Sequence, residues 1–422
     1  MNVRITKPVQ GGSVRAIASK SGAHRLLICA ALADAETFIT CSDRSEDIDA
    51  TARCVQTLGA EVRYERDGFA VTPLNGRDAE QYALDCGESG STLRFMLPVC
   101  GALGLRAAFY MGGRLPERPL SPLYGEMAAH GCTLSEPGKS PLLCDGQLNS
   151  GLFTLPGNVS SQFISGLLFA LPCLAGDSVI KVTGVLESRP YLDMTLDALR
   201  LYGITVREDD RVFRIPGGQI FRSPQNINVE GDWSNAAFWL SAGAIGKGAV
   251  ACGGLNINSR QGDRAVAVLL ERFGAGVVYA EDVITVSPGN LRGIDIDASN
   301  TPDLVPVLAA VAAVAQGKTV IRNAGRLRLK ESDRLRAIAA SLSGLGADIT
   351  ETEDGLAVIG KNQLAGGQTK SFGDHRIAMV AAVVSAVCEA PVEIKGAEAV
   401  NKSYPGFFYD FSAYLGGEWE EY

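Results

Sequence analysis

The sequence predicts an α/β protein of two domains, in which six similar units are divided three and three. Three observations lead to this prediction. The chain has 422 residues, which is too long for a single ordinary core. A helix end followed by glycine and an alternating strand recurs along the chain, and a very apolar helix recurs in the same register. Since a fixed period indicates a repeated supersecondary unit, each unit is expected to contain both helices with short strands between them.

The glycine marker recurs at steps of 72, 72, 71 and 72 residues, by subtraction of its positions. Each marker glycine stands between a helix end and a strand. They are Gly59, Gly131, Gly203, Gly274 and Gly346. A sixth copy begins at Leu415, but the chain ends before its strands can follow. We expect the N-terminal strand NVRITKP to fill that gap, which makes the C-terminal domain discontinuous.

The apolar helices begin at steps of 70, 70, 71, 71 and 71 residues, by the same subtraction. A helix that is apolar on most faces must be buried. Ser and Asp at such a start are N-cap residues, which accept hydrogen bonds from the unpaired amides of the first turn. The predicted starts lie just after Ser21, Ser91, Ser161, Asp232, Asp303 and Asp374.

The repeats divide into one domain of residues 1–18 plus 231–422 and an inserted domain of residues 19–230. If the buried helices of a domain run parallel, their N-termini gather at one end. Each N-terminus carries roughly half a positive charge and free N–H groups, which favour anions. The sequence therefore predicts an active-site cleft between the domains for a multiply anionic ligand.

The composition limits the classes of partner. The net charge of −8 argues against nucleic acid or an anionic membrane, while local clusters of Lys and Arg still allow a small anionic substrate. The ten cysteines lack the spacing of a zinc site or redox dithiol, so we expect free core thiols in a reducing compartment. Three histidines are too few for a multi-histidine metal centre. The N-terminus lacks the apolar core of a signal peptide, and we expect a cytoplasmic protein.

Cations and small polar residues gather where the repeats predict helix starts. A glycine-rich stretch from Cys86 to Arg94 lets backbone amides approach a ligand, and Ser160-Ser161-Gln162 offers neutral hydrogen-bonding groups. Each charged cluster taken singly is typical of a solvated face. Eight cations at corresponding ends of repeats together indicate anion binding. They are Lys20, Arg25, Arg114, Arg118, Lys330, Arg334, Arg376 and Lys402.

These motifs, in this order, resemble those of the 5-enolpyruvylshikimate-3-phosphate synthase family. The resemblance runs from Ser19 to Pro405, through SKS, GESGSTLR, ERP, SSQ, ESRPY, EGD, KESDR, GDHR and KSYP. It implies a two-domain enolpyruvyl transferase fold with three βαβαββ units per domain around buried parallel helices. It also implies transfer of the enolpyruvyl group of phosphoenolpyruvate to the 5-hydroxyl of shikimate 3-phosphate, with release of phosphate, in the shikimate pathway of aromatic amino acid biosynthesis. No metal or other cofactor is expected.

The resemblance implies which residues bind each substrate, and each substrate carries a carboxylate and a phosphate. Those expected to hold shikimate 3-phosphate are Lys20, Ser21, Arg25, Ser160, Ser161, Gln162, Ser188, Tyr191, Asp303 and Lys330. Those expected to hold phosphoenolpyruvate are Lys20, Gly90, Arg118, Gln162, Arg334, Arg376 and Lys402.

It also implies the catalytic groups. Asp303 would accept the proton of the 5-hydroxyl or orient that hydroxyl, and Glu331 would protonate the methylene carbon of phosphoenolpyruvate. Lys20 and Lys330 would lie at the site shared by both substrates. Addition needs an acid for the carbon and a base for the hydroxyl, and such groups each contribute roughly 10²–10⁴-fold in rate.

The sequence departs from the family pattern at a few positions. Ile17 and Ala18 replace the common Pro-Gly, and His24 and Glu88 each replace a common Asn. Glu88 is an anion near the expected phosphoenolpyruvate, and it either repels that substrate or points away and pairs with Arg94. Because Gly90 is not enlarged, the resemblance implies that glyphosate competes with phosphoenolpyruvate.

Two other functions fit parts of the pattern. A sister enolpyruvyl transferase acts on UDP-N-acetylglucosamine with the same fold and donor, but its usual reactive Cys is missing from YMGGRLPERP, and it lacks KESDR and SSQ. A non-catalytic anion-binding repeat module would keep the glycine period without needing both Asp303 and Glu331. The expected partners are the two small-molecule substrates, with no nucleic acid or membrane, and the chain is expected to be a monomer.

Overall fold

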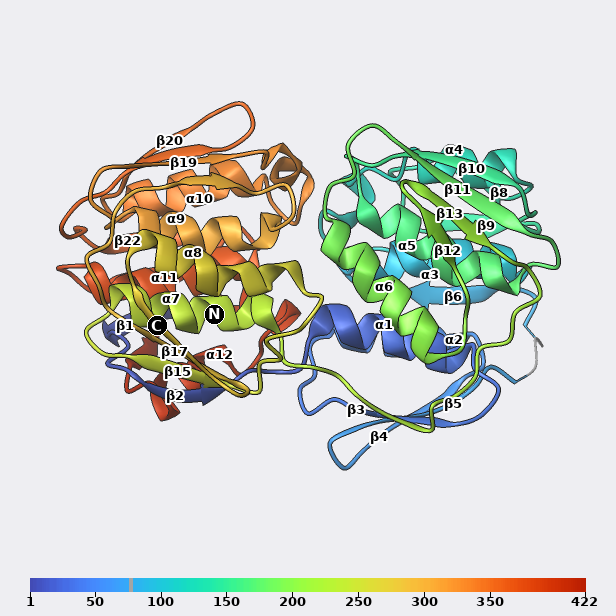
Figure 1. Ribbon diagram of the computed structural model, residues 1–422, viewed down its shortest axis with the longest axis horizontal. Helices are drawn as coiled ribbons and strands as arrows, with labels where there is room; N and C mark the ends of the chain where they lie inside the picture. Colours follow the sequence, from blue (N-terminus) through green and yellow to red (C-terminus); the bar gives the residue numbers. More distant parts are fainter. Residues whose placement is uncertain (76–78) are drawn as a thin grey trace. The chain divides into compact units, whose positions relative to one another are not determined.

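The computed structural model describes residues 1–75 and 79–422 (Figure 1). These residues form six four-stranded sheets and twelve α-helices. Contacts divide the chain into two units. Unit 1 consists of Met1–Ile17 with Glu230–Tyr422, and unit 2 consists of Ala18–Val229. Each unit holds three of the sheets and six of the α-helices, so the predicted α/β architecture of six repeats is confirmed.

Unit 2 contains the first three core helices and the helices that flank them. Its sheets are ordered β14 (Asn226–Asn228)–β3 (Thr37–Thr40)–β5 (Gly68–Thr72)–β4 (Glu61–Glu65), β6 (Tyr82–Asp85)–β7 (Ala107–Tyr110)–β9 (Leu142–Asp145)–β8 (Thr133–Leu134) and β10 (Leu152–Pro156)–β11 (Ser178–Thr183)–β13 (Val212–Ile215)–β12 (Arg207–Asp209). Its α-helices are α1 (Lys20–Ala31), α2 (Glu46–Thr57), α3 (Gly90–Ala102), α4 (Leu123–Ala129), α5 (Ser161–Ala170) and α6 (Arg189–Leu201).

Unit 1 repeats this arrangement. Its sheets are ordered β16 (Gly276–Ala280)–β17 (Val283–Ser287)–β15 (Val250–Gly253)–β2 (Gly12–Arg15), β18 (Asp295–Asp297)–β19 (Lys318–Arg322)–β21 (Leu356–Ile359)–β20 (Asp348–Glu351) and β22 (Gly367–Lys370)–β23 (Val392–Lys395)–β1 (Asn2–Lys7)–β24 (Glu418–Glu421). Its α-helices are α7 (Trp233–Ile245), α8 (Ala265–Phe273), α9 (Val305–Ala312), α10 (Arg334–Gly344), α11 (His375–Val384) and α12 (Phe407–Ala413).

Every sheet combines one parallel pair of strands with two antiparallel pairs. In the second sheet of unit 1, for example, β18 pairs parallel with β19, and β19, β21 and β20 follow antiparallel. In five sheets the edge strand of the antiparallel part and the strand beside it are consecutive along the chain, as β20 and β21 are. In the sixth, β24 ends the chain and β1 lies between it and β23. The N-terminal strand therefore completes the sixth repeat, as predicted.

Strands β2 and β14 explain how the chain is shared between the units. Strand β2 precedes α1 in sequence but pairs with β15 of unit 1. Strand β14 precedes α7 but pairs with β3 of unit 2. Each of these strands therefore stays in the unit from which the chain is about to leave, and the two crossings follow directly after them.

The odd-numbered helices form the cores. All thirteen residues of α7, all eight of α9 and all ten of α11 are buried. These three helices pack against one another in unit 1. Fully burying an aliphatic or aromatic side chain stabilises the fold by about 1.5–3 kcal/mol, so a helix buried on all faces contributes far more than its intrinsic propensity does. The prediction of very apolar, buried helices is confirmed.

The marker glycines end the flanking helices in the left-handed conformation. Gly274, the C-cap of α8, has φ 106°, a value that side chains with a Cβ rarely adopt. The other four markers, Gly59, Gly131, Gly203 and Gly346, also have positive φ, and so does Gly416 in the sixth copy. The repeat of glycine thus has a backbone cause, because each repeat turns out of its flanking helix at the same point.

Three predicted N-caps are displaced. The cap of α1 is Ser19, not Ser21, and the cap of α3 is Ser89, not Ser91. In both cases the capping hydroxyl accepts a hydrogen bond from the amide three residues later, so the earlier serine of each Ser-x-Ser is the one placed correctly. Helix α5 likewise starts at Ser161, with Ser160 as its cap.

The aspartate starts are confirmed at two of three positions. Asp232 caps α7 and Asp374 caps α11. Asp303 caps nothing: it lies in the short 3₁₀ helix η4 (Pro302–Leu304) that precedes α9. Its carboxylate instead accepts from an arginine side chain.

The described part of the chain has no helix of the length and apolarity needed to cross a membrane. All ten cysteines are free thiols, and eight of them are buried.

Because β1 is an inner strand of its sheet, shortening the Ile5 side chain should destabilise unit 1. Ile5 is 2% exposed, while the neighbouring Arg4 side chain is 45% exposed and its ion pairs with Glu393 and Glu420 are as long as 3.8 Å. We expect Ile5→Ala to lower the unfolding free energy of unit 1 by about 2–5 kcal/mol. The matched control Arg4→Ala should lower it by less than about 1 kcal/mol, because exposed ion pairs contribute little. Thermal and denaturant unfolding measure both, and equal effects would contradict the placement of β1 in the core.

Candidate active site

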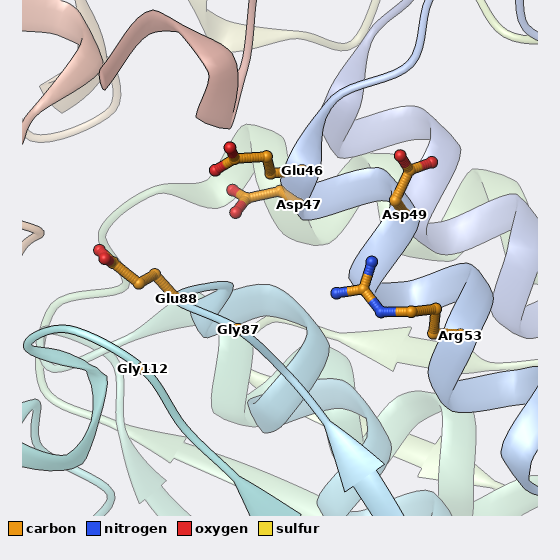
Figure 2. A pocket seen from close by; sticks show the side chains of 7 residues that line it. All are labelled: Glu46, Asp47, Asp49, Arg53, Gly87, Glu88 and Gly112. Atoms are coloured by element: carbon orange, nitrogen blue, oxygen red, sulfur yellow. The ribbon is translucent and has the colours of Figure 1, made fainter. Parts of the chain in front are cut away.

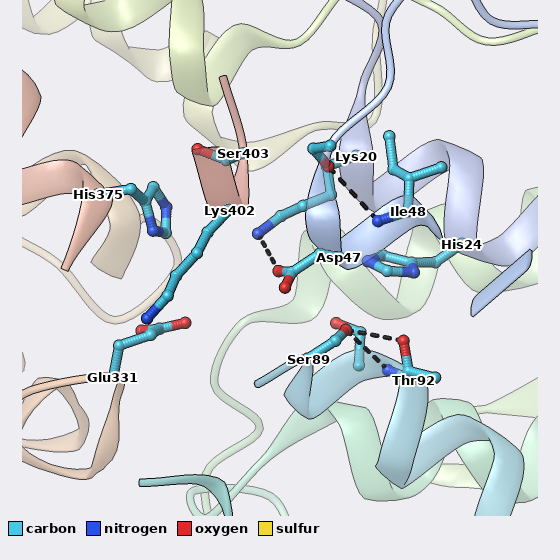
Figure 3. Close-up of polar contacts among 12 residues, drawn as sticks. Lys20, His24, Asp47, Ile48, Ser89, Thr92, Glu331, His375, Lys402 and Ser403 are labelled. Carbon is cyan, nitrogen blue, oxygen red and sulfur yellow. Dashed lines mark hydrogen bonds and ion pairs between the residues drawn. The ribbon is translucent and has the colours of Figure 1, made fainter. Parts of the chain in front are cut away.

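Lys20 opens α1 and is held by the first turn of α2. Its ammonium nitrogen lies 2.7 Å from Asp47 Oδ2, and the two side chains are only 16% and 13% exposed (Figure 3). The pair is therefore shielded from much of the screening that weakens surface ion pairs. Ser21, in the same turn, is half-buried, and its carbonyl accepts a hydrogen bond from Arg25.

Arg25 joins α1 to α6. Its Nη2 donates to the carbonyl of Tyr191 at 2.8 Å and its Nε donates to Thr195 Oγ1 at 2.9 Å. Only 3% of Arg25 is exposed, and burial lowers its pKa to about 10. The guanidinium thus lies below the start of α1 and fixes the backbone of Tyr191, one of the predicted binding residues.

The starts of α3 and α5 are tied together through Gln162. Its Oε1 accepts from Arg94 Nη1 at 2.7 Å, and its Nε2 donates to Ser91 Oγ at 2.9 Å. Arg94 also donates to the carbonyl of Pro119 at 2.9 Å. These bonds bring the glycine-rich loop, the Arg118 loop and the Ser160-Ser161-Gln162 segment to one place in unit 2.

Gly90 lies directly against Arg118. A Cβ added at Gly90 would be 2.9 Å from Arg118 Nη1, which is closer than side chains normally approach. The absence of a side chain at this position therefore allows the guanidinium to lie over the first turn of α3. The N-terminus of α3 carries a partial positive charge and Arg118 carries a full one, so together they favour the binding of an anion.

Ser188 has a strained backbone at the start of α6. Its φ of 54° and ψ of 36° place it in the left-handed region, where non-glycine residues are uncommon, and it is 3% exposed. Strain of this kind persists only where the surrounding structure enforces it, and it occurs often at ligand sites. Ser160 and Ser161 begin α5, and Ser160 Oγ accepts from the amide of Gln162.

An acidic hollow lies between the first turn of α2 and the loop before α3. Figure 2 shows Glu46 and Asp47 from α2 facing the same space as Glu88. The Glu88 carboxylate lies over Gly113, where an added Cβ would be 2.5 Å from Oε1. The structure therefore places Glu88 at the rim of this hollow, which is lined by Glu46, Asp47, Asp49, Arg53, Gly87, Glu88 and Gly112.

In unit 1, Arg334 gathers three carboxylates. Its Nη1 donates to Asp303 Oδ1 at 2.9 Å, its Nη2 to Glu331 Oε2 at 2.6 Å, and its Nε to Asp374 Oδ2 at 2.8 Å. The side chain is 1% exposed. Burial lowers the pKa of Arg334, but Asp374, Glu331 and Asp303 outweigh burial and raise it overall. The guanidinium is therefore a permanent cation that sets the positions of Asp303 and Glu331.

Arg376 and Lys402 lie at the start of α11. Arg376 Nη2 is 3.4 Å from Asp303 Oδ2, so Asp303 contacts two arginines. Lys402 Nζ donates to the carbonyl of Gly373 at 2.8 Å, directly before the helix. Lys330, half-buried, ends the 3₁₀ helix η5 (Gly325–Leu329) one residue before Glu331.

Asp263 is a further buried carboxyl in unit 1. It lies in the 3₁₀ helix η3 (Gly262–Arg264), is 3% exposed, and its Oδ1 makes no hydrogen bond. Burial, followed by the nearby Asp303 carboxylate, raises the pKa of Asp263 to about 7. At neutral pH this group is thus partly protonated beside the predicted base.

The predicted residues form two clusters, one in each unit. Lys20, Ser21, Arg25, Gly90, Arg118, Ser160, Ser161, Gln162, Ser188 and Tyr191 belong to unit 2, and Asp303, Lys330, Glu331, Arg334, Arg376 and Lys402 belong to unit 1. The sequence analysis predicts no substrate-binding or catalytic role for Arg94, Asp374, Asp47 or Asp263. Arg94 and Asp374 stand inside the motifs GESGSTLR and GDHR, which was a usable signal. Asp47 and Asp263 stand among other acids or turn residues and carry none.

Comparisons with known proteins cover the whole chain. The family model described as EPSP synthase (3-phosphoshikimate 1-carboxyvinyltransferase) matches residues 3–411. A 3-phosphoshikimate 1-carboxyvinyltransferase from Clostridium kluyveri is 45% identical over 413 residues, which is 97% of this chain and 96% of the relative. One from Clostridium perfringens is 44% identical over 419 residues, 98% of each chain. The solved structure of an EPSP synthase from Acinetobacter baumannii matches with a TM-score of 0.82 and 26% identity over all of both chains.

Because the pKa of Asp263 is raised, replacing this carboxyl by a neutral amide should increase the thermal stability of the protein, and the increase should depend on pH. As pH rises from about 4 to 7, unfolded Asp263 loses its proton before the folded form does, so this group lowers stability increasingly over that window. Asp263→Asn should therefore raise the apparent Tm at pH 8 by at least about 2–4 °C, equivalent to about 1 kcal/mol, and the gain should shrink towards pH 4.

The control for this prediction is Asp348→Asn, which neutralises an exposed carboxylate of β20 in the same unit. It should leave the Tm unchanged across the same pH range. A gain for Asp263→Asn that is absent at pH 8, or equal at pH 4 and pH 8, would contradict the assignment.

Proposed function

Because the chain belongs to the EPSP synthase (3-phosphoshikimate 1-carboxyvinyltransferase) family, we propose that it transfers the enolpyruvyl group of phosphoenolpyruvate to the 5-hydroxyl of shikimate 3-phosphate and releases inorganic phosphate. This reaction is a step of the shikimate pathway, which leads to the aromatic amino acids. The match over nearly the full length of both the chain and its relatives carries this conclusion.

The hydrogen bonds of Arg334 support distinct catalytic roles for Asp303 and Glu331. One guanidinium holds both carboxylates, by Nη1 and Nη2, at 2.9 and 2.6 Å. Holding two reacting groups in fixed geometry removes orientational entropy from the barrier. We assign Asp303 as the base for the 5-hydroxyl and Glu331 as the acid for the methylene carbon.

The reaction has an addition step and an elimination step. Glu331 gives a proton to the methylene carbon of phosphoenolpyruvate, which becomes a methyl group and leaves C2 electrophilic. The 5-oxygen of shikimate 3-phosphate bonds to C2 and its proton passes to Asp303. In the elimination step the C2–O bond to phosphate breaks, a methyl proton returns to Glu331, and the leaving phosphate takes the proton held by Asp303.

Glu331 must carry a proton to act as an acid. Its Oε2 accepts a hydrogen bond from Arg334 Nη2, and a neighbouring cation favours the charged form of a carboxyl. An anionic substrate placed beside it adds negative charge, which favours the protonated form of a carboxyl. Binding of phosphoenolpyruvate thus supplies the condition under which Glu331 can protonate it.

The remaining residues of both clusters act on the same pair of substrates in this proposal. Phosphate groups carry about −1.5 to −2 charge near pH 7, and each substrate also has a carboxylate. Ser160, Ser161, Gln162, Ser188, Tyr191, Ser21, Arg25 and Lys330 hold shikimate 3-phosphate; Gly90, Arg118, Gln162, Arg334, Arg376 and Lys402 hold phosphoenolpyruvate; and Lys20 contacts both. The cations and helix starts offset repulsion among the four anionic groups.

Gly90 and Arg118 suggest how a small anion is recognised. Their close approach leaves backbone amides and a guanidinium at one place, with no Cβ between them. We propose that glyphosate, which is also a small anion, competes with phosphoenolpyruvate here. We also propose that the chain acts as a monomer in the cytoplasm, where its ten free thiols suit a reducing compartment.

The proposed function is tested by measuring inorganic phosphate released from phosphoenolpyruvate. One tube contains shikimate 3-phosphate and a parallel tube contains UDP-N-acetylglucosamine. We expect release in the first tube alone. Release in the second alone would keep the donor and overturn the acceptor, and release in neither would favour a non-catalytic anion-binding module.

Glu331→Gln tests the acid. The amide keeps the size of the side chain but has no carboxyl proton to give, so kcat should fall at least 10²-fold. Glu353→Gln, an exposed glutamate of the same unit, is the matched control and should keep the normal rate. Steady-state phosphate release measures both variants, and a near-normal kcat for Glu331→Gln would remove it from this role.

A further inference from the structure

Helices α1 and α2 are joined at two successive turns. At the first turn, Lys20 pairs with Asp47 at 2.7 Å. One turn further along both helices, His24 Nδ1 lies 2.7 Å from Thr51 Oγ1. Both contacts are four residues apart on each helix, so they are the same face of α1 meeting the same face of α2. They hold this face of α1 against α2.

The second contact continues to the start of α3. Thr51 Oγ1 lies 2.7 Å from Thr92 Oγ1. Thr92 Oγ1 donates to Ser89 Oγ at 2.7 Å (Figure 3). Ser89 is the cap of α3 and also accepts from the amide of Thr92. All four side chains, from His24 to Ser89, are at most 1% exposed. A continuous buried chain of hydrogen bonds therefore links α1, α2 and α3.

The direction of these bonds defines the state of the histidine. Because the Thr92 hydroxyl donates to Ser89, it must accept from Thr51, and Thr51 must then accept from His24 Nδ1–H. His24 Nε2 is buried and has no hydrogen-bond partner. Burial, then the charges of Lys20 and Arg25, lower the pKa of His24 well below its usual value. The ring is neutral, with its hydrogen on Nδ1.

We propose that His24 is a positioning residue for phosphoenolpyruvate, acting through Thr51 and Thr92 to fix the start of α3, where Gly90 lies against Arg118. This inference rests on the proposed function. None of the three residues is expected to touch a substrate. This series of hydrogen bonds connects α1, which carries Lys20, to the loop before α3, whose backbone amides are expected to bind phosphoenolpyruvate.

The position of the donor nitrogen explains why histidine can stand here. Nδ1 of histidine and Nδ2 of asparagine are attached to the same atom, Cγ, so both side chains place an N–H at the same distance from the backbone. Asparagine at this position would therefore donate to Thr51 as His24 does. Leucine has a similar volume but no donor, and it would leave Thr51 with an unmet hydrogen bond, which is costly when buried.

The kinetic test compares Thr51→Val with a matched control, Thr369→Val. Both remove one hydroxyl from a buried threonine that bonds another hydroxyl, Thr369 to Ser341 at 2.8 Å in unit 1. Thr51→Val and His24→Leu should each raise KM for phosphoenolpyruvate at least about five-fold and change KM for shikimate 3-phosphate less than two-fold. His24→Asn should recover most of the loss seen with leucine, and Thr369→Val should change neither KM.

A measurement on the wild-type protein is independent of catalysis. With ¹⁵N-labelled histidine, the chain gives three ring systems, and His24→Asn identifies the one lost. We expect the His24 ring to show the Nδ1–H tautomer without titrating between pH 8 and 6. An Nε2–H tautomer, or titration near pH 6.5, would overturn the proposed chain.

The outcomes separate the two proposals. If the wild-type enzyme releases no phosphate, the proposed function is wrong, but the measured tautomer of His24 is not affected by that result. Active variants of Thr51 and His24 whose KM for phosphoenolpyruvate stays within two-fold of wild type would overturn the positioning role. If Thr51→Val does not fold, His24→Leu with its asparagine rescue decides the matter.

Discussion

The structure depends on one constraint: the core helices of unit 1 are buried along their whole length, so their first-turn amides must find partners inside the protein. Helices α7, α9 and α11 expose no residue. A buried N–H without a partner costs roughly 1–3 kcal/mol, which is a large fraction of a domain's stability. Asp232 and Asp374 meet this need by capping α7 and α11, while α9 follows directly from the 3₁₀ helix η4. The result is a protein that concentrates its buried polar groups at a few places, and the candidate active-site residues are drawn from those places.

A charge buried at a helix start interacts strongly with a bound anion, and it also needs a compensating charge within the protein. Arg334 is 1% exposed and is compensated by three carboxylates, Asp303, Glu331 and Asp374. Removing one partner of a buried pair commonly costs about 3–5 kcal/mol, because the other charge is left uncompensated. The same low polarity strengthens every charge interaction with a bound substrate. Asp374 shows how the two demands meet, since it caps α11 through Oδ1 and accepts from Arg334 through Oδ2.

Much of this could be predicted from the sequence, and the failures have physical reasons. The period of the glycines and of the apolar helices gave six repeats, because each marker glycine turns the chain at the same left-handed point. The helix starts were two residues late at Ser21 and Ser91, since either serine of a Ser-x-Ser can cap and only backbone geometry selects one. Pairs such as His24 with Thr51, or Thr51 with Thr92, are 27 and 41 residues apart and leave no local pattern. Which residues touch the substrates stays a prediction.

The two units carry different residues at the starts of their core helices. In unit 2 the caps are the neutral serines Ser19, Ser89 and Ser160, so the partial positive charge of each helix N-terminus remains available to an anion. In unit 1 the caps of α7 and α11 are Asp232 and Asp374, whose carboxylates offset that charge. Asp303 lies in η4 before α9, and Arg334 donates to both Asp303 and Asp374. Neutral caps suit recognition of phosphate and carboxylate groups, while carboxylates held by arginine suit proton transfer. A single repeated scaffold thereby carries neutral caps in one unit and carboxylates held by arginine in the other, which matches the division into binding and acid–base groups that we propose.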